Sequence, residues 1–126
     1  MTGLQRVAQL AGWVFVVIAI WGALLTGTSM EPDPGRAPLL WGLFPVNFLH
    51  NLVHMLLGVW GIAASRSAGG ARTYVLGAGI IYLVLAVLGV VAPSGFGLVP
   101  LGGHGIWLHA LFGVGLLVAS ATRRLR

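Results

Sequence analysis

The chain has 126 residues, of which 58% are hydrophobic and only 7% are charged. Soluble domains carry about a quarter charged residues, so this composition argues against a water-soluble fold. The net charge of +5 comes from arginines at the ends of apolar runs, not from a basic patch with exposed aromatic residues, so we expect no nucleic-acid partner. We expect a single transmembrane domain over residues 1–126.

Four stretches reach the length of about 20 apolar residues that a membrane-spanning helix needs. They cover approximately residues 7–27, 46–65, 72–92 and 104–122. The first stretch could be mistaken for a signal peptide, but we interpret it as an ordinary first helix. The sequence therefore predicts an all-α, integral membrane four-helix bundle.

The connections between these helices alternate in charge. The N-terminus, the turn at residues 65–72 and the C-terminal tail hold six of the seven arginines. Because positive charge marks the cytoplasmic side, both termini are expected in the cytoplasm, in a multi-pass protein of the inner (plasma) membrane. Gly69 and Gly70 are expected to end the second helix in a tight turn. The opposite loop contains Pro32 and Pro34 and cannot be helical.

An internal repeat appears when the chain is compared with itself at an offset of 55 residues. Eleven identities fall within the 31 positions from 37 to 67, and they include Pro38 with Pro93, Pro45 with Pro100, His54 with His109 and Gly58 with Gly113. The repeat units are approximately residues 1–67 and 68–126, each a helical hairpin. Since both units run in the same direction, we expect two tandem hairpins related as a parallel repeat, with the second and fourth helices buried against each other.

One face of the second helix is polar. It consists of Asn47, His50, Asn51 and His54, at spacings i, i+3, i+4 and i+7. A lipid-facing helix would not carry such a face, so it should point inward or toward a partner. His109 extends this polar surface if the helices of the two hairpins meet, whereas His104 should lie apart from it near the outer boundary.

Three interpretations of this polar face stay open. In the first, the side chains only hydrogen-bond between helices and fix their packing. In the second, the histidines bind a cofactor: His54 and His109 as the two axial ligands of haem b, or His50 and His54 as ligands of a divalent metal ion. In the third, the face forms a polar or proton pathway, although no membrane-embedded carboxylate supports it.

Two glycines lie four residues after the repeated histidines. Gly58 and Gly113 therefore sit one turn deeper on the same helix faces. Small residues let two helix backbones approach closely, and we expect Gly58 and Gly113 to serve as helix-packing notches.

No catalytic residues are evident. Cysteine is absent, which excludes disulfides, thiolate metal sites and cysteine nucleophiles. Both acidic residues, Glu31 and Asp33, share one loop, and no phosphate-binding loop follows a strand. We expect a non-enzymatic protein: an accessory or packing subunit of a membrane complex, or a self-associating bundle. Its expected partners are membrane lipid and either other membrane subunits or further copies of the chain.

The segment LFPVNFLHNLVH at residues 43–54, followed by Leu57-Gly58, resembles a bacterial four-helix membrane family known as domain of unknown function 4383. The Trp107-Leu108-His109 step is similar to the same family. The resemblance implies the four-helix fold and topology over nearly the whole chain, but no established function. The family often carries an aspartate and an asparagine at the start of the fourth helix, where this chain has Gly103, His104 and Gly105.

Overall fold

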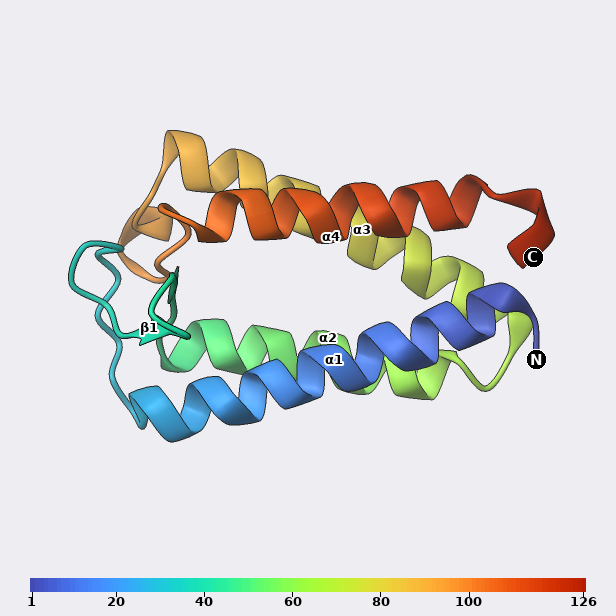
Figure 1. Cartoon of the computed structure of the whole chain (residues 1–126), viewed down its shortest axis with the longest axis horizontal. Helices are drawn as coiled ribbons and strands as arrows, with labels where there is room; N and C mark the ends of the chain where they lie inside the picture. Colours follow the sequence, from blue (N-terminus) through green and yellow to red (C-terminus); the bar gives the residue numbers. More distant parts are fainter.

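The structure, a computed structural model covering residues 1–126, is an elongated arrangement of four helices (Figure 1). The helices are α1 (Gly3–Thr26), α2 (Phe48–Ala64), α3 (Ala68–Val91) and α4 (Gly105–Ala121). Two short strands, β1 (Leu39–Leu40) and β2 (Phe44–Pro45), form an antiparallel pair before α2. Short 3₁₀ turns, η1 (Gly95–Gly97) and η2 (Arg123–Leu125), precede and follow α4. The prediction of an all-α fold with four helices is confirmed.

Capping residues explain why α1 and α3 begin four residues earlier than expected. The Thr2 side chain accepts a hydrogen bond from the Gln5 amide (3.1 Å), and the Gln5 side chain accepts one from the Thr2 amide (2.8 Å). This reciprocal pair satisfies amides that a helix start leaves free. Ser67 caps α3 in a similar way by accepting from the Gly70 amide (3.0 Å). Gly70 therefore belongs to the first turn of α3, and the expectation that it ends the preceding helix is wrong.

The helices associate as two hairpins. α1 packs along α2 and α3 packs along α4, while the hairpins meet through α3, which contacts both α1 and α2. α2 and α4 make few backbone contacts. The expectation that these two helices are buried directly against each other is therefore wrong. The side chains of His50 and His54 on α2 nevertheless reach that of His109 on α4, with ring centroids 5.4 and 5.9 Å apart.

Two glycines allow the closest helix approaches within the hairpins. A Cβ atom on Gly58 would lie 2.7 Å from the carbonyl oxygen of Gly12 on α1. A Cβ atom on Gly113 would lie 2.9 Å from the amide nitrogen of Leu83 on α3. Side chains at either position would force the paired helices apart, so each glycine lies at a contact between helix backbones.

Two loops close the end opposite the termini. Each contains a backbone hydrogen bond, and the two bonds lie at positions 55 residues apart. The Val46 amide donates to the Pro38 carbonyl (3.0 Å), and the Leu101 amide donates to the Pro93 carbonyl (2.8 Å). We call residues 38–46 and 93–101 the outer loops. Each outer loop folds back on itself and leads into the start of a helix.

The tips of the two outer loops also share an uncommon backbone conformation. Trp41 and Phe96 have positive φ angles of 54° and 59°, and the glycines that follow them, Gly42 and Gly97, have φ angles of 73° and 83°. Left-handed conformations are rare for large side chains. Their occurrence at equivalent positions indicates that both loops make the same turn.

Two helices are long and apolar enough to cross a membrane. α1 and α3 have 24 residues each, which corresponds to about 36 Å of helix. α2 and α4 are apolar but shorter, with 17 residues each, or about 26 Å. Large apolar side chains cover the outside of the bundle, and Leu24, for example, is 84% exposed.

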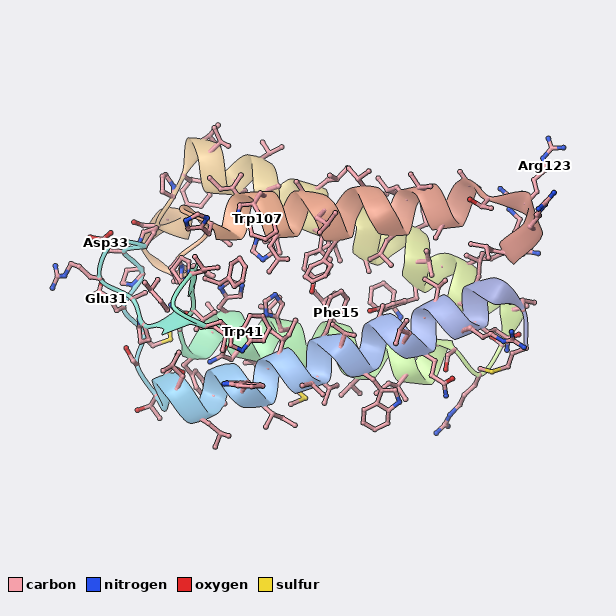
Figure 2. All side chains as sticks on the ribbon, in the orientation of Figure 1. Phe15, Glu31, Asp33, Trp41, Trp107 and Arg123 are labelled. Atoms are coloured by element: carbon pink, nitrogen blue, oxygen red, sulfur yellow. The ribbon has the colours of Figure 1, made fainter.

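Charge separates between the two ends of the molecule. Both termini lie at one end, together with the turn between α2 and α3, where the Gln5 side chain donates to the Ser65 carbonyl (3.0 Å) (Figure 1). Glu31 and Asp33 lie at the opposite end, away from Arg123 (Figure 2). The acidic residues and most of the arginines are therefore about a helix length apart.

Candidate metal centre

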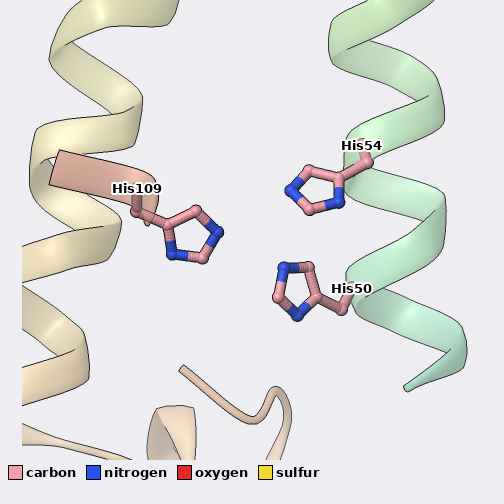
Figure 3. A group of neighbouring side chains, drawn as sticks. All are labelled: His50, His54 and His109. Carbon is pink, nitrogen blue, oxygen red and sulfur yellow. The ribbon is translucent and has the colours of Figure 1, made fainter. Parts of the chain in front are cut away.

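Three histidines meet between the hairpins. His50 and His54 project from α2 toward His109, which projects from α4 (Figure 3). All three are buried, with exposed fractions of 4%, 6% and 2%. The i, i+4 spacing on α2 places His50 and His54 on one face, one turn apart. The histidines that the sequence assigned separately to a haem pair and a metal pair thus form one cluster.

The three rings are close enough to share one ligand. Ring centroids are 4.5 Å apart for His50 and His54, 5.4 Å for His50 and His109, and 5.9 Å for His54 and His109. One nitrogen from each ring lies within 4.8 Å of the others. Tetrahedral coordination with metal–nitrogen bonds of 2.0–2.1 Å requires nitrogens roughly 3.3 Å apart. Small side-chain rotations would close this difference.

Five of the six ring nitrogens in the cluster are buried without a hydrogen bond: both nitrogens of His50, both of His54, and Nδ1 of His109. The Pro100 backbone lies near the His50 ring but does not meet hydrogen-bond geometry. Leaving a buried polar group unpaired costs about 1–3 kcal/mol. Several unpaired buried nitrogens that face one space indicate that a ligand from outside the protein binds them.

The asparagines on the same face of α2 have protein partners. The Asn47 side chain accepts from the His50 amide (2.9 Å) and donates to the Leu98 carbonyl (2.8 Å), so it caps α2 and joins it to the second outer loop. The Asn51 side chain donates to the Thr26 hydroxyl (2.9 Å) at the end of α1, while its Oδ1 atom is buried without a hydrogen bond. The asparagines therefore have structural roles that the histidines lack.

A small cavity adjoins the three histidines beneath the first outer loop. Its volume is about 20 Å³, and its lining includes Trp41, Phe44, Gly105 and all three histidines. A space of this size holds about one water molecule. It suits a single ion and does not accommodate the macrocycle of haem b, so the arrangement favours a metal ion over the haem alternative.

Aromatic rings close the other side of the cluster. The Tyr82 ring lies 6.0 Å from the ring of His54 and 5.6 Å from that of His109. Phe15 packs on Tyr82 at 4.8 Å, and Phe112 packs on Phe15 at 5.1 Å. These rings form an aromatic floor between the histidines and the half of the bundle that contains the termini, and the Tyr82 hydroxyl is buried there without a hydrogen bond.

His104 lies outside the cluster. It is exposed, and its Nδ1 accepts a hydrogen bond from Nε1 of Trp107 (3.1 Å). Gly105 lies 55 residues after His50 and lines the cavity. A Cβ atom on Gly105 would lie 3.9 Å from the Cε1 atom of His109. The second hairpin has Gly105 where the first has His50, so the second hairpin contributes one histidine to the cluster and the first contributes two.

Comparison with known proteins identifies the family. The family model described as Domain of unknown function (DUF4383) matches residues 5–122. The chain belongs to this family. No curated protein and no solved structure matches it. The resemblance seen in the sequence is thus confirmed, and a function for this DUF4383 chain has to be argued from its own geometry.

Some residues around the centre had no signal in the sequence. Trp41 and Phe44, which cover the cavity, lie in a stretch that we expected only to be apolar and non-helical. Tyr82 and Phe15 form the floor but read as ordinary residues of apolar helices. Their roles depend on how the two hairpins are placed, which helical periodicity does not specify.

Proposed function

We propose that this DUF4383 protein is a non-enzymatic, multi-pass membrane protein that binds one transition-metal ion through His50, His54 and His109. The observation that carries the proposal is the convergence of three buried imidazoles, of whose six ring nitrogens five make no hydrogen bond within the protein. Neutral imidazole is the commonest protein ligand for such ions.

Four membrane crossings follow if α2 and α4 accompany the longer helices. Each of these shorter helices packs along a 24-residue apolar helix in an antiparallel hairpin. The outer loops extend the reach of both at one end. The accumulation of arginines at the end that holds both termini supports a cytoplasmic position for that end. The metal site then lies in the outer half of the inner membrane, about 9 Å from the start of α2.

A tandem, parallel repeat of hairpins accounts for a site that takes histidines from both hairpins. The equivalent hydrogen bonds and left-handed turns of the two outer loops support this relation. So does the matching of Gly58 with Gly113 at the helix contacts. On this view the repeat brings His54 and His109 to similar depths, and His50 is an addition found only in the first unit.

The donor set selects the kind of ion. Three nitrogen ligands suit zinc, copper or nickel, whereas magnesium and calcium prefer oxygen ligands. Neither acidic residue is near the centre, since both lie in the loop before β1. The protein therefore supplies no charge to balance the ion, which favours monovalent copper or a zinc ion that brings its own anion.

The ion would join the two hairpins. α2 and α4 make few backbone contacts, and a shared ion would connect His50 and His54 of one hairpin to His109 of the other. The aromatic floor supports a fixed ion and not one that crosses the bundle. This role is compatible with an accessory or packing subunit, or with a self-associating bundle, whose ordered shape depends on metal.

The test is metal binding by the purified full-length protein. Protein in detergent is incubated with Zn²⁺, or with Cu⁺ under reducing conditions, then freed of excess ion and analysed for metal by mass spectrometry. We expect one ion per chain, and a strong loss of metal in H50A, H54A and H109A. The matched control is H104A, which removes a histidine outside the cluster and should retain the ion.

Two outcomes would contradict the proposal. One is wild-type protein that retains neither ion at concentrations of about 100 µM. The other is metal that is lost equally in H104A and H54A, because binding would then not depend on the cluster.

A further inference from the structure

A second site lies at the end of the bundle that holds the termini. A cavity of about 360 Å³ opens there between α1, α3 and the end of α4. It is lined by Leu4, Arg72, Leu76, Ser120, Ala121 and Arg126. Two arginines from distant parts of the sequence thus border one cavity whose other walls are apolar or uncharged.

The two arginines have no counter-ion in the protein. The ion pair in this structure joins Arg36 to Glu31 at the opposite end of the molecule. The Arg126 side chain makes only a long contact to the Ser120 carbonyl (3.5 Å), and the Arg72 side chain donates no hydrogen bond. Guanidinium groups bind phosphate through paired hydrogen bonds, so an anionic phosphate suits this cavity.

An apolar groove lies on the outside of α3, farther along the helix from Arg72 and Leu76. It has a volume of about 280 Å³ and is lined by Ile80, Leu83, Val84, Val87 and Leu88. Arg72, Leu76 and Ile80 follow one another at i, i+4 spacing, so the cavity and the groove share one face of the helix. Leu76 and Ile80 are about half exposed along this face.

We infer that an anionic phospholipid binds here, with its phosphate between Arg72 and Arg126 and an acyl chain in the groove of α3. Charge complementarity selects the phosphate, and the groove that runs away from it selects a lipid over a free phosphate. Basic pockets at the cytoplasmic ends of transmembrane helices commonly bind lipid headgroups. This inference does not depend on the metal centre, which lies near the other end of the molecule.

The headgroup contact is tested by native mass spectrometry of the full chain in detergent with added phosphatidylglycerol. The double variant R72Q/R126Q is expected to bind the lipid at least tenfold more weakly than wild type. The matched control R66Q/R123Q removes the same charge at the same end without altering the cavity, and should stay within about twofold of wild type. Equal weakening in both double variants would overturn the inference, because it would indicate general attraction to positive charge.

The lipid and free-phosphate sources are separated by two further measurements. Inorganic phosphate at 10-fold excess over the lipid should not displace it, and displacement would overturn the assignment to a lipid. The variant I80W fills the groove and should weaken binding at least threefold, while V59W, at an exposed position on α2, should not. Lipid affinity that is unchanged in I80W would contradict the placement of the acyl chain. A thermal unfolding transition, measured in every variant, reports whether the fold is intact.

Discussion

The polar residues of α2 fall into two groups that behave differently although they alternate along one helix face. The amide side chains of Asn47 and Asn51 find partners in the second outer loop and in α1. The imidazoles of His50 and His54 find none and instead face His109. Burial alone therefore does not define a structural residue. The asparagines complete the fold from within, and the histidines remain to be completed by a ligand.

Substitution of a histidine in the cluster should have the largest effect, which is a loss of metal affinity. Replacing His54 with alanine removes one of three ligands and should weaken metal binding at least about 100-fold, or about 2.7 kcal/mol. Competition with a chelator of known affinity measures the change. A loss below about threefold would show that His54 is not a ligand.

Substitution of an asparagine should instead lower the stability of the fold. Replacing Asn47 with alanine removes the cap of α2 and the bond to the Leu98 carbonyl. The expected cost in unfolding free energy is about 2 kcal/mol, most of it from the cap. Denaturant unfolding of the metal-free protein in detergent measures it. A loss in stability below about 0.5 kcal/mol would remove the distinction between the two groups.

A smaller effect is expected from H54L in the absence of metal. Leucine replaces two unpartnered buried nitrogens with apolar atoms, so the metal-free variant should be as stable as wild type or more stable by about 1 kcal/mol. Added metal should stabilise wild type and leave H54L unchanged. If H54L destabilised the metal-free protein by more than about 2 kcal/mol, the imidazole would have structural partners that this account denies.

The smallest expected effect is that of N51A. It removes one interhelical hydrogen bond, from Asn51 to Thr26, and such bonds contribute about 0.6 kcal/mol on average in membrane proteins. Thermal unfolding should therefore shift only slightly, and metal affinity should stay within twofold of wild type. A tenfold loss of metal affinity would mean that the asparagines and histidines act as one unit.

The sequence predicted the helices and the polar face because both follow from local periodicity. It also predicted a relation between His54 and His109, since the internal repeat relates distant segments without any structure. Helix starts were less accurate because Thr2 and Ser67 act as caps several residues before the apolar runs. The sequence predicted that His109 extends the polar face only if the two hairpins meet. Whether His50, His54 and His109 form one cluster depends on the separation of α2 and α4, which the sequence does not specify.

The outer loops were also only partly predictable from the sequence. Their matching positions in the repeat were visible in the sequence, through Pro38 with Pro93 and Pro45 with Pro100. Their left-handed turns at Trp41 and Phe96 were not visible, because neither residue type favours a positive φ angle. The cover that the first outer loop places over the metal centre is therefore a product of tertiary structure.

X-ray absorption spectroscopy of the metal-loaded protein tests the central claim most directly, because it reports the atoms around the ion. For zinc, we predict three imidazole nitrogens at about 2.0–2.1 Å, and two in the H109A variant. An ion surrounded only by oxygen atoms, or a spectrum that is the same in H109A and wild type, would show that the three histidines do not form the metal centre.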